Sequence, residues 1–127
     1  MTTTENPVLN WTLLYVADPL KSADFYEKIL GVPARDRAPG FSMFALANGM
    51  LLGLWLKGDV IPAANAPGGA ELSFTEANPS AVEARAELFR GLGVTILQEP
   101  TEMDFGFTFT AQDPDGHRIR VFAPGQA

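Results

Sequence analysis

The sequence repeats one order of elements twice, and this duplication limits the folds that the chain can adopt. An apolar stretch from Leu9 to Ala17 is followed by Asp18-Pro19, and a second one from Ala70 to Ala77 is followed by Asn78-Pro79. Asp and Asn accept hydrogen bonds from the first N–H groups of a helix, and proline has no N–H to lose at the first helical position. Each copy therefore begins with a predicted strand that leads into a helix.

The two predicted helices also end alike. Each runs into a Leu-Gly-Val sequence, at 30–32 in the first copy and at 92–94 in the second. Glycine takes the left-handed conformation that ends many helices without a steric penalty. We therefore predict helices over about 19–30 and 79–92. The first carries its apolar side chains on one stripe, namely Leu20, Ala23, Tyr26, Ile29 and Leu30.

Three further strands are predicted after each helix. In the first copy an edge strand from Val32 to Arg37 precedes a hairpin that turns at Asn48-Gly49, a pair typical of tight hairpins. In the second copy the hairpin turns at Asp113-Pro114-Asp115-Gly116. The remaining predicted strands are Phe41–Ala47, Met50–Lys57, Val94–Gln98, Phe105–Ala111 and His117–Phe122. Each copy is thus a βαβββ module.

These elements predict an α+β fold built from two tandem modules. We expect one curled, eight-stranded mixed sheet around a concave cavity, with both helices on the outer face. Module one covers about 8–57, a linker rich in proline, glycine and alanine covers 58–69, and module two covers about 70–124. A chain of 127 residues that is 46% hydrophobic can build one core, whereas each module alone is small for independent folding. We therefore expect a single domain over 1–127.

The composition excludes several classes of function. The chain has no cysteine, which rules out disulfides, thiol nucleophiles and cysteine metal sites. A net charge of −6 argues against nucleic acid as a partner. No apolar run approaches the about 20 residues of a membrane span, so we expect no membrane partner. The segment Met1–Asn6 lacks the basic and apolar regions of a signal peptide, which predicts a disordered lead-in and a cytoplasmic protein.

The alternation of side chains along strands predicts the lining of the concave face. By this parity the lining consists of Trp11, Leu13, Tyr15, Gly53, Trp55, Glu71, Ser73, Arg120 and Phe122. The two tryptophans either pack in a core or dimer contact, or stack against a flat ring system. Glu71 and Arg120 either form an ion pair that bridges the two modules, or offer their polar ends to a ligand.

Two segments at the ends of the modules resemble a known superfamily. Leu14–Asp18, followed by Lys21–Tyr26 and Leu30-Gly31, resembles the opening signature of the vicinal oxygen chelate superfamily, and Asp113–Ile119 resembles its closing signature. This superfamily includes glyoxalase I, extradiol dioxygenases and bleomycin-resistance proteins. The resemblance covers residues 8–124 and implies paired βαβββ modules.

The resemblance also implies four positions at which the enzymes of the superfamily hold a divalent metal. Carried over to this chain, these positions are Trp11, Gly53, Glu71 and Arg120, of which only Glu71 has a metal-ligating side chain. Because a cation needs three or four N or O donors and a guanidinium repels it, we expect neither metal nor other cofactor. The sole histidine, His117, lies beside a ligand position, and we assign no catalytic residue.

The chain is more similar to the metal-free resistance members, of the phenazine-antibiotic resistance type. The residues that carry this similarity include Leu14–Val16, Trp55, Glu71, Glu99-Pro100 and Phe105-Gly106. It implies a homodimer that binds and sequesters a planar aromatic small molecule, in which partners can complete each other's cavities. The expected ligand-binding residues are Trp55, Arg120, Glu71, Tyr15, Trp11, Ser73 and Phe122. The alternative is a glyoxalase- or dioxygenase-like enzyme, a lyase or oxidoreductase, with a non-standard site.

Overall fold

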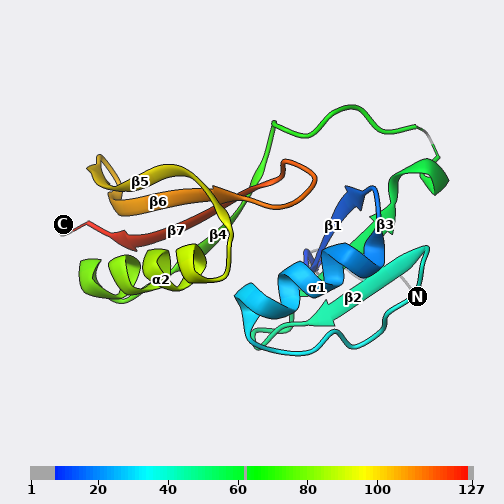
Figure 1. Cartoon of the computed structure of the whole chain (residues 1–127), viewed down its shortest axis with the longest axis horizontal. Coiled ribbons are helices and arrows are strands. Elements are labelled where there is room, and N and C mark those ends of the chain that lie inside the picture. The colour runs from blue at the N-terminus through cyan, green and yellow to red at the C-terminus, as the bar shows by residue number, and fades with distance from the viewer. Residues whose placement is uncertain (1–7, 62, 126–127) are drawn as a thin grey trace, which may run out of the picture.

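The first module is a three-stranded sheet covered by one helix. The computed structural model of the chain describes residues 8–61 and 63–125, so the predicted lead-in Met1–Asn6 and Pro62 of the linker lie outside the described residues. The strands are β1 (Trp11–Val16), β2 (Phe41–Ala45) and β3 (Leu51–Leu56), in the order β1-β3-β2. β1 is parallel to β3, β2 is antiparallel to it, and α1 (Pro19–Leu30) connects β1 to the hairpin (Figure 1).

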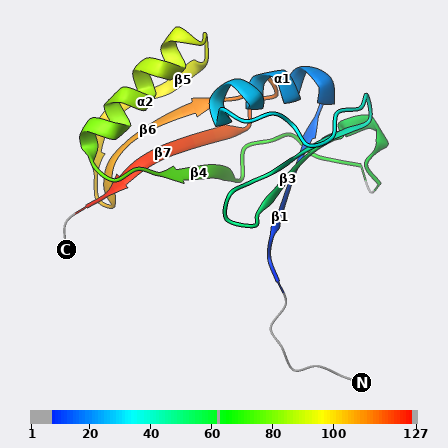
Figure 2. The same cartoon turned by 90° about the horizontal axis from the view of Figure 1, so that it is seen from below.

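The second module repeats this arrangement with one more strand. A short 3-10 turn, η1 (Lys57–Asp59), and the linker lead to it; its elements are β4 (Glu71–Thr75), α2 (Pro79–Gly91), β5 (Thr95–Met103), β6 (Gly106–Gln112) and β7 (Arg118–Pro124). The strand order is β4-β7-β6-β5, with β4 parallel to β7 as β1 is to β3. Figure 2 shows both helices on the same side of the sheets, which leaves the opposite faces uncovered by helices.

The helix boundaries follow the predicted caps. The Asp18 side chain accepts hydrogen bonds from the backbone N–H groups of the first turn of α1, and Asn78 accepts one from Ala81 N at 2.9 Å. After the helices, Gly31 and Gly93 have φ angles of 74° and 80°, in the left-handed region. Local sequence therefore sets where both helices begin and end.

Two features of the predicted sheet are wrong. The described residues form seven strands rather than eight, because the predicted edge strand from Val32 to Arg37 is reduced to one isolated bridge between Asp36 and Met43. The strands also form two sheets instead of one, since β1 and β4, the facing edges of the two modules, are not hydrogen-bonded to each other.

Several hydrogen-bonding groups of the segment from Val32 to Arg37 bond to side chains of α1. Ala34 N donates to the Glu27 carboxylate on α1 at 2.8 Å, and Pro33 has no N–H to donate to a neighbouring strand. The Arg37 guanidinium forms ion pairs with Asp24 at 2.7 Å and with Glu27 at 3.2 Å. The segment is thereby tied to α1, and its backbone bonds to β2 are confined to Met43.

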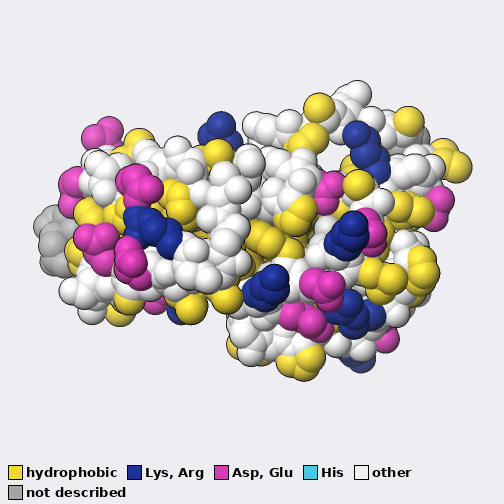
Figure 3. All heavy atoms as spheres, viewed as in Figure 1, with side chains coloured by type: hydrophobic (Ala, Val, Ile, Leu, Met, Phe, Trp, Pro, Cys, Tyr) yellow, Lys and Arg dark blue, Asp and Glu magenta, His cyan; other side chains and the backbone are white. Residues whose placement is uncertain are grey.

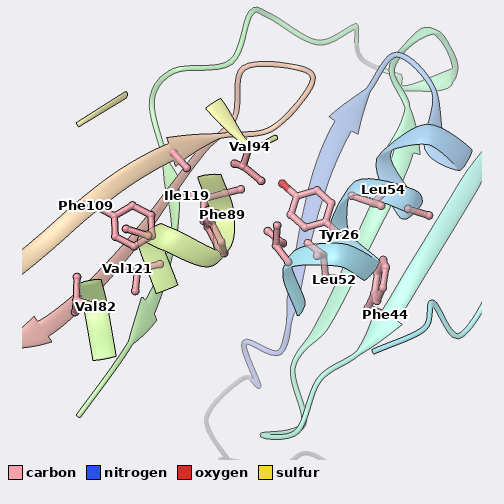
Figure 4. Packing of buried hydrophobic residues seen from close by; sticks show 14 of the residues in the cluster. Tyr26, Phe44, Leu52, Leu54, Val82, Phe89, Val94, Phe109, Ile119 and Val121 are labelled. Carbon is pink, nitrogen blue, oxygen red and sulfur yellow. The ribbon is translucent and has the colours of Figure 1, made fainter. Parts of the chain in front are cut away.

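The buried apolar side chains of the two modules form one cluster. It includes Tyr26 of α1, Leu54 of β3, Phe89 of α2 and Phe109 of β6, each 2% exposed or less. In Figure 4 the hydroxyl of Tyr26 points from the first module toward the second. No helix among the described residues is long and apolar enough to cross a membrane.

The β6–β7 turn fastens the second module to α1 and β1. Tyr26 donates its hydroxyl hydrogen to Asp113 Oδ2 at 2.8 Å, and Ala17 N donates to Asp115 Oδ1 at 2.8 Å. The carbonyl oxygen of Tyr15 accepts a hydrogen bond from His117 Nε2 at 3.0 Å. Burial, together with the Asp113 carboxylate, raises the pKa of Tyr26 far above its ordinary value, so that this hydroxyl remains a donor. His117 thus serves the junction between the modules.

Candidate functional site

The face of the first sheet that points away from α1 carries exposed aromatic side chains. Along β1, Val16 is buried, whereas Trp11 is 42% exposed and Tyr15 is 37% exposed, as the predicted alternation requires. The sheet register places Tyr15 beside Trp55 and Trp55 beside Phe41. We call Trp11, Tyr15, Phe41 and Trp55 the aromatic wall.

The rings of the wall contact one another in pairs. Tyr15 and Trp55 pack edge to face with centroids 6.0 Å apart, and Trp11 and Phe41 pack at a tilt with centroids 6.5 Å apart. Sequence analysis missed Phe41, although the hairpin around Gly49 could have revealed it. Counting back from that turn pairs Phe41 with Trp55 and gives both the same face.

The wall closes over Gly53, one of the four positions carried over from the metal enzymes. A Cβ atom at this position would lie 2.6 Å from Leu13 Cδ2 and 2.8 Å from Phe41 Cζ. Such separations are shorter than a van der Waals contact between carbons. The space next to Gly53 is therefore filled by apolar side chains.

The corresponding face of the second sheet carries a hydrogen-bonded group centred on Arg120. Arg120 Nε donates to Glu71 Oε2 at 2.7 Å, and Nη1 lies 3.2 Å from Thr108 Oγ1 and 3.4 Å from Gln98 Oε1. Ser73 Oγ donates to the same Glu71 oxygen at 2.9 Å. We call Glu71, Ser73, Gln98, Thr108 and Arg120 the polar cluster. Gln98 and Thr108 were missed from sequence because their strands were predicted without a register.

The predicted ion pair between Glu71 and Arg120 is present, but both of its residues lie in the second module. It joins β4 to β7 within the second module, so the expected bridge between the modules is wrong. The two side chains are 33% and 17% exposed, respectively. Phe105 covers the Arg120 guanidinium at 5.4 Å from its ring centroid and packs edge to face on Phe122 at 5.8 Å.

The surroundings of Glu71 favour its ionised form. Burial alone raises its pKa, but hydrogen bonds from Arg120 and Ser73 and the charges of Arg120 and Arg118 together lower that pKa below the ordinary value of 4.5. A carboxylate with a lowered pKa in the folded state stabilises the fold above its unfolded pKa and loses this contribution as the pH falls through the folded pKa. Glu71 therefore contributes to stability at neutral pH.

Glu71→Gln is expected to lower the free energy of unfolding at pH 7. The difference from wild type is expected to shrink as the pH falls below the ordinary pKa of 4.5 and through the lower pKa of Glu71 in the folded state. Urea denaturation at pH 7 and pH 3 measures both differences. Glu102→Gln, at an exposed residue of β5, is the matched control and should change stability by less than about 0.5 kcal/mol. A difference independent of pH would contradict the assignment.

A cleft of about 400 Å³ lies where the two modules meet. Leu13 and Tyr15 of β1 line one side, and the linker residues 65–69 and Glu71 line the other. Lys57, Asp115, His117 and Arg118 also line it. We call it the seam cleft. It shares Tyr15 with the aromatic wall and Glu71 with the polar cluster, so it lies between these two groups.

The predicted site residues thus fall into two groups. Trp11, Tyr15 and Trp55 lie together on the first sheet, whereas Glu71, Ser73, Arg120 and Phe122 lie together on the second. Among the described residues no ring contact or hydrogen bond joins the wall to the polar cluster directly. Lys57 and Arg118 were not singled out from sequence. Their signal was available, because both have the parity of their neighbours Trp55 and Arg120.

Comparison with known proteins identifies the family. The sequence pattern of the Glyoxalase/Bleomycin resistance protein/Dioxygenase superfamily matches residues 8–121. The chain belongs to this superfamily. Among curated relatives, the phenazine antibiotic resistance protein EhpR of Enterobacter agglomerans is 30% identical over 118 residues, which cover 88% of each chain.

Solved structures share the fold of this chain. A protein from Agrobacterium tumefaciens, determined by NMR in solution, is 46% identical with a TM-score of 0.84, covering 91% of this chain and 96% of that one. A glyoxalase-related enzyme from Fulvimarina pelagi is 23% identical with a TM-score of 0.80, covering 91% and 87% of the two chains. The second likeness concerns the fold alone.

The residues at the four positions of the superfamily's metal do not fit a metal ion. Leu13 and Phe41 fill the space at Gly53, and Arg120 donates to the one carboxylate available, that of Glu71. No group of three or more His, Cys, Asp or Glu residues gathers within residues 8–61 and 63–125. Because a cation at this place would have one anionic ligand and a guanidinium beside it, we derive no chemistry through a metal.

Proposed function

We propose that this protein binds a planar aromatic small molecule on the concave face and sequesters it. Membership of the superfamily and the likeness to a phenazine antibiotic resistance protein support a resistance-type or glyoxalase-like role. The aromatic wall is the observation that carries the finer proposal. It exposes rings that pack edge to face or at a tilt, and a flat ligand ring placed on them gains about 0.5–1.5 kcal/mol per aromatic contact beyond buried area.

The polar cluster supplies the second half of the proposed site. Arg120 uses Nε and Nη1 in the cluster, and its Nη2 atom makes no hydrogen bond to any described residue. That nitrogen can donate to a ring nitrogen or oxygen of the ligand, and Ser73 and Phe122 flank it on the same face. In this proposal the wall holds the ring and the cluster fixes its orientation.

Trp55→Ala is expected to weaken binding of phenazine at least tenfold, about 1.4 kcal/mol, because it removes the central ring of the wall. Isothermal titration calorimetry measures the affinity, with quenching of the remaining tryptophan as a second readout. Trp55→Phe retains a ring and should keep most of the affinity. Leu88→Ala, on the outer side of α2 and 47% exposed, is the control expected to bind like wild type.

Equal affinity of Trp55→Ala and wild type would contradict the stacking role. Consumption of the bound compound, seen as a change in its absorption spectrum under turnover conditions, would instead support the alternative of an enzyme with a non-standard site. The proposal also includes a homodimer, since Trp11, Leu13 and Tyr15 expose a contiguous apolar surface on one strand. Light scattering of the purified protein tests that part by giving the molar mass in solution.

A further inference from the structure

We propose that the seam cleft is a subsite for an acidic substituent of the aromatic ligand, held by Lys57 and Arg118. This inference rests on the proposed function, because it names the class of ligand that the same site takes: a planar aromatic acid. It assigns the carboxylate to the cleft between the modules and not to Arg120.

Several basic side chains of the protein already have a carboxylate partner. Arg37, Arg85, Arg90 and Arg120 each form an ion pair with a nearby carboxylate. Neither Lys57 nor Arg118 has a carboxylate oxygen within 4.0 Å among the described residues. On the face seen in Figure 3, basic side chains are interspersed with acidic ones over both modules. Lys21, Lys28 and Arg35 also have no carboxylate oxygen within 4.0 Å among the described residues, so what sets Lys57 and Arg118 apart is that both line the same cleft.

The other polar side chains of the cleft have hydrogen-bond partners of their own. Asp115 accepts from Ala17 N at 2.8 Å and from Ser22 Oγ at 3.3 Å, and Glu71 accepts from Arg120 and Ser73. His117 donates to the backbone of Tyr15. The carboxylates of the cleft are thus engaged by groups other than Lys57 and Arg118. The charge of Glu71 is offset by Arg120, whereas Asp115 keeps its negative charge because its donors are neutral. Lys57 and Arg118 therefore exceed the remaining carboxylate charge of the cleft by one, and an anion of the ligand would neutralise that excess.

The seam cleft adjoins the aromatic wall. Tyr15 belongs to both the wall and the cleft, and Arg118 lies opposite Glu71 in the β4–β7 register, two residues before Arg120 on the same face. A ring on the wall next to Tyr15 can therefore extend a substituent into the cleft, whose volume of about 400 Å³ is that of a small-molecule pocket. Arg120, with three hydrogen bonds and Phe105 on its face, is less open to a carboxylate.

The experiment compares two probes, phenazine and phenazine-1-carboxylate, by calorimetry at low and at physiological salt. Wild type is expected to bind the acid about tenfold more tightly, with a preference that weakens as salt rises. Lys57→Met and Arg118→Met should each reduce this preference and the double variant should abolish it, while all three bind phenazine as wild type does. Lys28→Met, an exposed lysine in the last turn of α1, is the charge-matched control that should leave both affinities unchanged.

A second readout locates the carboxylate. In NMR titrations of the wild type, the amide signals of Gly68, Gly69 and Arg118 should shift with the acid and not with phenazine, since these residues line the cleft. An undiminished preference for the acid in the double variant would overturn the inference while leaving the proposed function standing. Failure of wild type to bind either compound would overturn the proposed function, and the inference with it.

Discussion

Asp113→Ala is expected to destabilise the protein by about 3–5 kcal/mol, because it leaves several donors without their acceptor. The Asp113 side chain is 3% exposed and accepts from the hydroxyl of Tyr26 at 2.8 Å, from Asp115 N at 2.9 Å and from His117 N at 2.8 Å. Tyr26 is fully buried, so water cannot replace the lost partner. The urea midpoint, measured at constant m-value, gives the loss.

Two further variants separate the contributions to this junction. Tyr26→Phe removes one of the three hydrogen bonds and should cost about 1–3 kcal/mol. Glu83→Ala, an exposed carboxylate of α2, is the control and should stay within about 0.5 kcal/mol of wild type. A loss below about 1 kcal/mol in Asp113→Ala would show that the turn does not hold the modules as described.

Gly106→Ala is expected to destabilise the protein by about 3–5 kcal/mol, through backbone strain and a steric clash together. Gly106 has a φ angle of 144°, which residues with a Cβ atom rarely adopt, and it follows Phe105 directly. An added Cβ atom would clash with the carbonyl oxygen of Ala123 and lie 2.9 Å from Gly125 N. Thermal or urea denaturation measures the loss.

The same variant is expected to weaken ligand binding. The clash at Gly106 displaces the turn between β5 and β6, and this turn carries Phe105 away from Arg120. Gly91→Ala, at the end of α2 with open space where an added Cβ atom would lie, is the matched control. Because alanine is the better helix former, this control should be as stable as wild type or slightly more so. Equal stability of Gly106→Ala and Gly91→Ala would contradict the described packing of the β6–β7 hairpin.

Local signals in the sequence were enough to predict much of this fold. Asp18 and Gly31 bound α1 by interactions within a few residues, and the alternation along β1 correctly separates buried Val16 from exposed Tyr15. The repeated order of strand, helix and hairpin was likewise readable from the repeated caps. Features determined by neighbours in sequence were therefore predictable.

What could not be predicted depends on contacts between distant segments. The segment from Val32 to Arg37 has the composition of an edge strand, but Glu27 and Asp24 on α1 compete for its backbone and side chains. The gap between β1 and β4 depends on how the modules pack, which no local pattern encodes. For the site, parity gave the face of each residue, whereas the partners of Arg120 required the register of β5, β6 and β7.

The packing at Gly53 makes a metal site at this position and the aromatic wall mutually exclusive. A histidine or glutamate introduced there would have to push aside Leu13 and Phe41, and so would break up the surface on which Trp11 rests. An ion-binding centre at this place would thus demand coordinated changes at several positions, with the hydrophobic lining lost along the way. An engineer who wants an ion here should begin by shrinking residues 13 and 41.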